Sequence, residues 1–69
     1  MSSRTYICII SSNSSNERYY TVRTRSAMKC SEKYGRYEDG EQITVRTHSG
    51  KALSKVIYFA GIGYSNVTV

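Results

Sequence analysis

The sequence has few of the residues from which disulfide frameworks, metal sites and most catalytic centres are built. Its 69 residues include two cysteines, Cys8 and Cys30, one histidine, His48, and no tryptophan. Two thiols form neither a disulfide framework nor the set of about four ligands typical of zinc. A cysteine–histidine pair would need a thiol from a core element to meet a histidine in a turn. We therefore expect no metal, no cofactor and no enzymatic activity.

Long apolar runs and phosphate-binding glycine motifs are also missing. The run "YICII" at residues 6–10 is shorter than the roughly 7 to 15 apolar residues of a signal peptide. The stretch "GIG" at residues 61–63 lacks the third glycine of a dinucleotide-binding motif and any helix after it. We expect a cytoplasmic protein with free thiols and no membrane partner.

The chain is short, which limits it to one domain over residues 1–69. A chain of this size buries only about 60% of its unfolded surface, so it cannot divide its core in two. The hydrophobic share is 39%, above the level at which disorder is the default. We expect one folded domain with a thin core.

Acidic residues are scarce, since five Asp and Glu stand against ten Lys and Arg, for a net charge of +5. Up to Arg36 there are seven basic residues against two acidic ones, whereas the rest of the chain is balanced. Such an excess favours an acidic partner, such as nucleic acid or an acidic protein surface. A charge that only keeps the protein in solution explains the same numbers.

The first third of the chain is typical of a β-hairpin. Residues 5–10 are apolar on both faces, which predicts a central strand covered on one side. A polar loop follows at residues 11–17, and residues 18–24 then alternate. The expected core side of that second strand carries Tyr20, Val22 and Thr24, and its other face carries Tyr19, Thr21, Arg23 and Arg25.

Residues 26–35 change to the helical period. Their apolar stripe consists of Ala27, Cys30, Ser31 and Tyr34. Thr24 or Ser26 is suited to cap the start of the helix, and Gly35 is expected to end it in a left-handed conformation.

The last part of the chain predicts a turn and a second hairpin. We expect Glu38, Asp39 and Glu41 to be exposed in a turn, followed by a strand at residues 43–47 and a tight loop at Gly50. The return strand is expected at residues 55–64. Its two glycines, Gly61 and Gly63, indicate either a bend or a place where another backbone packs closely.

Together these elements predict an α+β fold of about four antiparallel strands, in the order ββαββ, with the short helix on one face. The other face is then open to water or to a partner. The alternation places Tyr19, Thr21, Arg23, Thr44 and Arg46 there, and the repeated "TVRT" at residues 21–24 and 44–47 supplies both arginines. Arginine forks, hydroxyls and a stacking ring suit phosphate or carboxylate recognition, although plain solvation of a strand explains the same residues.

Other basic residues extend this prediction. Lys51 and Lys55 lie next to the same face, and the helix carries a second basic surface. Clustered cations without a recognition helix favour contact with the backbone of DNA or RNA rather than with its bases. The predicted partner-binding residues are Tyr19, Thr21, Arg23, Arg25, Lys29, Lys33, Arg36, Arg46, Lys51 and Lys55.

In element order, size and charge, the chain resembles small inhibitor proteins of phages and mobile elements, in particular anti-CRISPR proteins directed at type I systems. The resemblance is carried by "YYTVRTRSAMKCSEKYG" at residues 19–35 and "ITVRTHSGK" at residues 43–51. It implies a non-enzymatic inhibitor that binds a host protein or ribonucleoprotein complex in a bacterial cytoplasm and blocks its nucleic-acid engagement. Two other hypotheses are a direct, sequence-nonspecific DNA- or RNA-binding module and a homodimer joined through residues 57–69.

Overall fold

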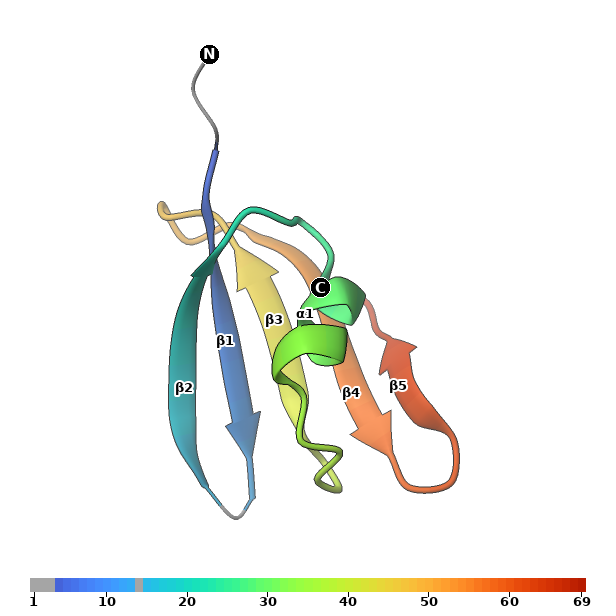
Figure 1. Cartoon of the computed structure of the whole chain (residues 1–69). Helices are drawn as coiled ribbons and strands as arrows, with labels where there is room; N and C mark the ends of the chain where they lie inside the picture. The colour runs from blue at the N-terminus through green and yellow to red at the C-terminus, as the bar shows by residue number, and fades with distance from the viewer. Residues whose placement is uncertain (1–3, 14) are drawn as a thin grey trace.

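The protein consists of a five-stranded antiparallel sheet and one helix that packs on one of its faces (Figure 1). The computed structural model describes residues 4–13 and 15–69. The elements in chain order are β1 (Tyr6–Ser12), β2 (Ser15–Val22), α1 (Ala27–Tyr34), β3 (Gln42–Arg46), β4 (Ala52–Phe59) and β5 (Gly63–Asn66). The predicted α+β class is confirmed, with one strand more than expected.

The strands lie in the order β2-β1-β3-β4-β5, so that β1 is flanked on both sides. This confirms the interpretation of the apolar residues 5–10 as a central strand. Because β2 and β3 are both antiparallel to β1, they run parallel to each other with β1 between them. The segment β2-α1-β3 is therefore a split β-α-β unit, which carries α1 across one face of the sheet.

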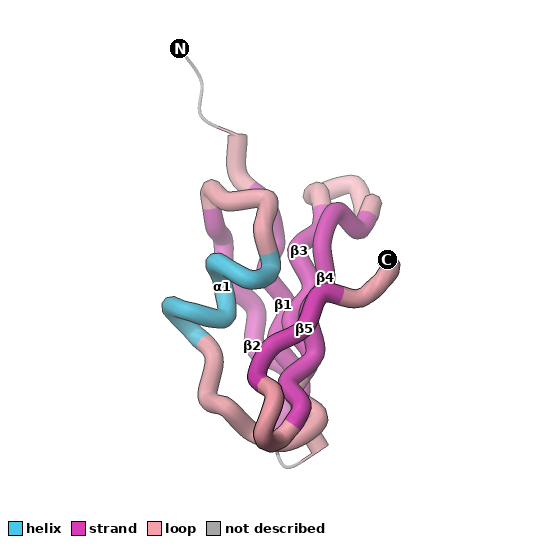
Figure 2. The backbone as a smooth tube through the Cα atoms, turned by 90° about the vertical axis from the view of Figure 1, so that its right-hand side faces the viewer, coloured by secondary structure: helices cyan, strands magenta, loops and turns pink. Residues whose placement is uncertain are grey.

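The core lies between that face and α1. Figure 2 shows the helix as a layer beside the sheet. Side chains alternate along each strand, so every second residue points toward the helix. Strands β1 and β3 each contribute two of the buried residues, β2 and β4 contribute one each, and α1 adds two more. The buried apolar residues are Cys8, Ile10, Val22, Ala27, Cys30, Ile43, Val45 and Val56.

The start of α1 follows from two hydroxyl side chains. Ser26 is the N-cap, and its Oγ accepts a hydrogen bond from the backbone N–H of Lys29. Thr24 Oγ1 in turn accepts from the N–H of Ser26 at 3.1 Å. Both residues proposed from the sequence thus take part, since each satisfies a backbone donor that the helix or its approach leaves free.

The predicted left-handed end of the helix at Gly35 is wrong. Gly35 is extended, with φ −64° and ψ 142°, and the nearby residue with positive φ is Tyr37 at 58°. A side chain at Gly35 would collide with the hydroxyl of Tyr64 and the carbonyl of Ser31. Glycine is therefore needed here for the close approach of β5 rather than for a left-handed backbone.

The predicted return strand at residues 55–64 is two strands. The chain reverses at residues 60–62, and Tyr58 of β4 then pairs with Tyr64 of β5. Gly61 and Gly63 have φ of 82° and 103°, which L-residues rarely adopt. A side chain built at either glycine would meet nothing within 4 Å, so the two glycines serve the turn and not a close backbone contact.

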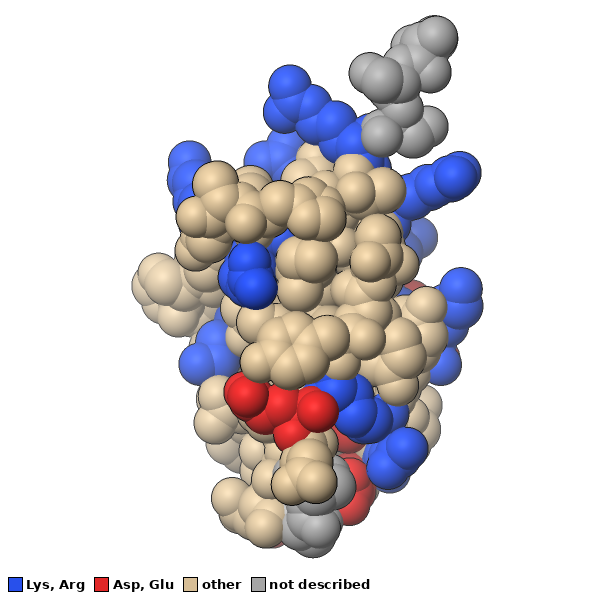
Figure 3. All heavy atoms as spheres, turned by 90° about the vertical axis from the view of Figure 1, so that its left-hand side faces the viewer, with Lys and Arg blue, Asp and Glu red and all other residues tan. Residues whose placement is uncertain are grey.

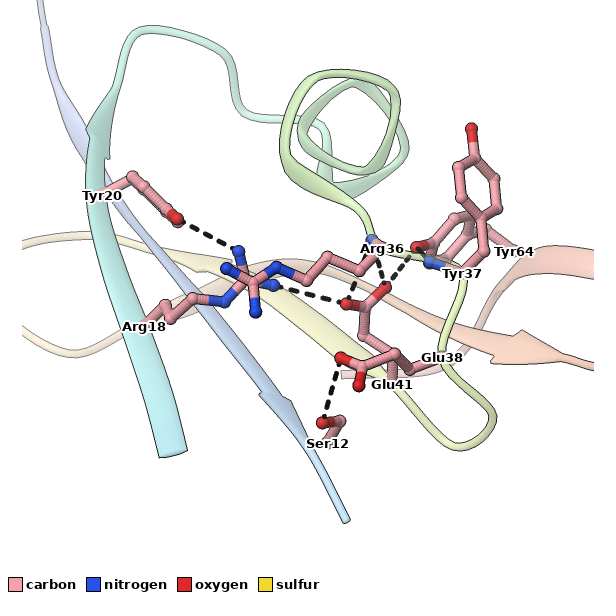
Figure 4. A network of polar contacts seen from close by, with 8 residues as sticks. All are labelled: Ser12, Arg18, Tyr20, Arg36, Tyr37, Glu38, Glu41 and Tyr64. Atoms are coloured by element: carbon pink, nitrogen blue, oxygen red, sulfur yellow. Dashed lines mark hydrogen bonds and ion pairs between the residues drawn. The ribbon is translucent and has the colours of Figure 1, made fainter. Parts of the chain in front are cut away.

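The prediction that Glu41 is exposed in a turn is also wrong, because its side chain has no exposed surface. Its two carboxylate oxygens accept hydrogen bonds from the backbone N–H of Arg36 at 3.2 and 3.3 Å and from the hydroxyl of Tyr64 (Figure 4). Arg18 of β2 completes the site with an ion pair at 3.4 Å. Glu41 thus connects the segment after α1 to both outer strands of the sheet, whereas Asp39 remains exposed as predicted.

Candidate partner-binding surface

The face of the sheet that points away from α1, here called the open face, carries most of the predicted strand residues. Strand register puts Thr21 of β2 and Arg46 of β3 on either side of Ile7. It likewise puts Tyr19 and Thr44 on either side of Ile9. Residues from chain segments more than twenty positions apart therefore meet on one surface.

The two "TVRT" segments occupy equivalent positions only in part. Val22 and Val45 both point into the core, and Thr21 and Thr44 both lie on the open face, as predicted. Arg46 is the last residue of β3, but Arg23 lies just beyond the end of β2. Arg23 instead lines a pocket between β2 and α1.

The middle of the open face is more apolar than the predicted set of residues. Ile7 and Ile9 of β1 and Ile57 of β4 are half-buried there, and α1, the helix of the described residues, packs on the opposite face. The unbroken apolar run of β1 already indicated this apolar surface. A strand that is covered on one side only leaves the apolar residues of its other face in contact with water. Exposed apolar surface of this kind marks contact sites more often than plain solvated strands do.

Tyr19 stands at the edge of these isoleucines with 57% of its surface exposed. Its hydroxyl donates a hydrogen bond to Glu17 Oε1 at 3.1 Å. This hydrogen bond and the charge of the Glu17 carboxylate raise the pKa of Tyr19, while nearby Arg46 acts in the opposite direction. The ring is thus oriented by its hydroxyl and leaves a face available for stacking.

Lys55 pairs with Thr44 and so extends the open face onto β4. Lys51 lies in the turn between β3 and β4, close to the end of β3. At this end of the sheet the first residues of β1 and β4 meet the last residues of β2 and β3, because neighbouring strands are antiparallel. The cations collected there, here called the basic end, are Arg4, Arg23, Arg25, Arg46 and Lys51.

Charge is separated along the strands. No acidic residue occurs in the segments that form the basic end, and Glu17, Glu38 and Asp39 lie near the turns at the opposite end. Figure 3, which looks at the β2 side, shows Lys and Arg side chains in both halves of the view and most of the visible Asp and Glu atoms in the lower half. The positive potential is therefore strongest at one end of the molecule.

The basic residues predicted along the helix do not form a single surface. Lys29 and Lys33 lie on the side of α1 that faces β2, around the same pocket as Arg23. Arg25 belongs to the loop that leads from β2 to α1, at the basic end. Arg36 follows the helix and lies on the side of the molecule that carries Glu41 (Figure 4).

The residues considered for catalysis are not brought together. Cys8 and Cys30 are buried next to each other between β1 and α1, and the hydrogen bond between the two thiols together with burial raises the pKa of Cys8. His48 is exposed in the turn after β3, where its ring contacts Thr5 Oγ1 at 2.9 Å. Sequence alone could not show that the two thiols meet.

The described residues, 4–13 and 15–69, contain neither a metal-ligand cluster nor a membrane-spanning helix. Within these ranges no three His, Cys, Asp or Glu side chains gather in a way that could hold a metal ion. The single described helix is too short and too polar to cross a membrane. Comparisons of the chain with protein-family models, curated proteins and solved structures found no match.

Proposed function

We propose that this protein is a small non-enzymatic binding protein that contacts the phosphate backbone of nucleic acid through its open face and basic end. The observation that supports this most directly is the basic end. Arg4, Arg23, Arg25, Arg46 and Lys51 come from four separate segments, and within the described residues none of them forms an ion pair with a carboxylate. Cations that lie at one end of a molecule without a carboxylate partner gain most from a polyanion.

The open face supplies what a phosphate patch alone lacks. Tyr19 offers an accessible ring, and half-buried Ile7 and Ile9 lie beside it. Base–aromatic stacking contributes about 1 to 3 kcal/mol per base and tolerates any sequence. This combination fits single-stranded nucleic acid better than duplex, because duplex bases are already stacked on each other.

The test is the affinity of the protein for a fluorescent single-stranded oligonucleotide over a series of salt concentrations. Each phosphate contact adds about 0.7 to the slope of log affinity against log salt. Arg46→Gln is expected to weaken binding about fivefold to tenfold and to reduce the slope by about 0.7, the value for one phosphate contact. Arg36→Gln makes the same charge change away from the open face and is the matched control.

Equal losses for Arg46→Gln and Arg36→Gln would show that only net charge matters, and the proposed surface would then be wrong. Arg46 Nη1 also donates to the carbonyl of Thr47 at 3.0 Å, so thermal unfolding of both variants must be compared first. A salt-independent affinity of the unmodified protein would contradict phosphate contact altogether.

A second candidate function is inhibition of a host nucleoprotein complex, as the resemblance to anti-CRISPR proteins suggests. The apolar middle of the open face supports a protein partner, since Ile7, Ile9 and Ile57 have little to gain from phosphates. A pull-down from bacterial lysate with and without nuclease separates the two candidates. Partners that survive nuclease treatment, together with no affinity for free strands, would favour the inhibitor.

A third arrangement, a homodimer through residues 57–69, would pair two copies of the edge strand β5. This strand has only four residues, which limits the backbone hydrogen bonds that such a pairing can form. Phe59, Ile62 and Val69 are exposed in the same segment and would be the apolar part of such an interface. The mass of the protein in solution distinguishes one copy from two.

A further inference from the structure

A pocket of about 320 Å³ lies between the end of β2 and α1. Its apolar part is made by Val22 and Cys30, which are buried, and by the half-buried ring of Tyr34. Ligand pockets in proteins begin at about 300 Å³ and are mostly apolar with a few polar groups. The volume therefore suits a single small ligand, about the size of one nucleotide.

Three cations surround this apolar surface. Arg23 comes from the end of β2, whereas Lys29 and Lys33 come from successive turns of α1. All three are exposed, and none forms an ion pair within the part of the chain that the structure describes. No Asp or Glu is among the lining residues. Three cations without a carboxylate partner around one pocket match a group with two negative charges, such as a phosphate monoester.

Neutral groups complete the site. Thr21 and Thr24 line the pocket between the cations. The oxygen of Thr24 already accepts from the N–H of Ser26, so its hydroxyl proton is free to donate to an anion. The ring of Tyr34 is held by stacking on Tyr20, with centroids 4.0 Å apart and planes inclined by 12°, and Lys33 Nζ lies over the ring, 5.4 Å from its centroid. The ring therefore keeps a cation next to the buried apolar side chains of the pocket, so that a phosphate and an apolar group of one ligand can bind side by side.

From this geometry we propose that the pocket between β2 and α1 binds one nucleoside monophosphate unit. The phosphate lies among Arg23, Lys29 and Lys33, and the nucleoside lies against Val22 and Tyr34. Such a unit has two sources, a free mononucleotide or the 5′-phosphorylated end of a strand. The second source rests on the proposed nucleic-acid function, and the first does not.

The first experiment titrates the full chain with adenosine monophosphate and follows backbone amide signals by NMR. We expect saturable shifts at residues 21–24 and 29–34, and affinities for adenosine and for inorganic phosphate that are each at least about tenfold weaker. Inorganic phosphate binding as tightly as the nucleotide would overturn the nucleoside part of the proposal. Shifts confined to other residues would overturn the site.

Two variants with the same loss of charge separate this pocket from the open face. Lys29→Gln with Lys33→Gln is expected to weaken mononucleotide binding about tenfold or more, since two charge-assisted contacts are lost. Arg46→Gln with Lys55→Gln is expected to leave mononucleotide affinity within about twofold while it weakens strand binding. Equal effects of the two variants on the mononucleotide would contradict the pocket.

The two sources of the ligand are distinguished with oligonucleotides that differ only in a 5′-phosphate. If the strand end occupies the pocket, the phosphate raises affinity, and the Lys29→Gln, Lys33→Gln variant removes that gain. If mononucleotide binds and the 5′-phosphate has no effect, the ligand is the free nucleotide. If the unmodified protein binds no mononucleotide, this site is refuted. If it binds mononucleotide but not unphosphorylated strands, only the proposed function is refuted.

Discussion

Glu41 joins three separate segments of the chain. Its carboxylate accepts from the backbone of Arg36, from the hydroxyl of Tyr64 on β5 and from the guanidinium of Arg18 on β2. The side chain is fully buried, and that of Arg18 is 19% exposed. A buried carboxylate is tolerated only when its oxygens are satisfied, and here both oxygens have partners.

Glu41→Ala is expected to lower the free energy of unfolding by about 3 kcal/mol, because it leaves the Arg18 guanidinium and a backbone N–H without their acceptor. Urea unfolding followed by far-UV circular dichroism measures the change. Asp39→Ala removes an exposed carboxylate two residues away and is expected to change stability by no more than about 0.5 kcal/mol. Similar unfolding midpoints for the two variants would contradict the role given to Glu41.

Tyr64 makes stability sensitive to alkaline pH. Burial, together with the hydrogen bond to Glu41, raises the pKa of Tyr64 to about 12. An unfolded tyrosine has a pKa of about 10, so the unfolded chain loses this proton first as pH rises. The stability that Tyr64 contributes is therefore complete below about pH 10 and is lost as pH rises toward 12.

Melting temperatures of the unmodified protein and of Tyr64→Phe, measured from pH 8 to pH 11.5, test this linkage. The variant is expected to be less stable at pH 8, because it lacks the hydroxyl that donates to Glu41 and accepts from the backbone N–H of Tyr37. The difference should shrink as pH rises above about 10. A difference that stays constant over this range would show that Tyr64 does not titrate as described.

Among the elements, strands and the helix were predictable where the periodicity of apolar side chains and a capping residue determine them locally. The alternation of β2 placed Tyr20 and Val22 toward the helix, and the stripe of α1 placed Ala27 and Cys30 in the core, both as observed. These signals are local, because the side-chain period of a strand or helix is fixed by its own backbone.

The errors arose where tertiary contacts decide. Tyr58 and Tyr64 share a face both in one long strand and in a hairpin, so periodicity could not detect the turn between β4 and β5. The burial of Glu41 depends on its partner Arg18, which lies 23 positions away in the chain. Over such a separation the sequence gives no signal that the two side chains pair. Gly35 is extended because Tyr64 approaches it from another strand.

The candidate binding surface was predictable to a similar extent. The alternation indicated that Tyr19, Thr21 and Arg46 share the open face, since the register of a sheet with one helix layer leaves them no other side. The gathering of strand ends into one basic end depends on strand order, which sequence did not supply. The pocket between β2 and α1 depends in addition on where the crossover places the helix.

In the whole molecule, the fold gathers basic residues at one end, so that a modest net charge is unevenly distributed. The antiparallel order places Arg4, Arg46 and Lys51 at one end, and the turns that carry Glu38 and Asp39 at the other. A +5 chain with evenly mixed charges would attract a polyanion weakly and without orientation. With the charges separated, a strand that approaches the basic end meets the open face on one side of the sheet.

Binding of nucleic acid by the open face and the basic end is tested most directly by an NMR titration of the protein with an unphosphorylated single-stranded oligonucleotide at low and at moderate salt. We expect the largest backbone amide shifts in residues 4–9, 19–25 and 44–55, with weaker binding at the higher salt concentration. The turns at residues 38–40 and 60–62, at the acidic end, should shift least. Shifts centred on those turns, or no shifts at low salt, would contradict the proposal that the open face and the basic end bind nucleic acid.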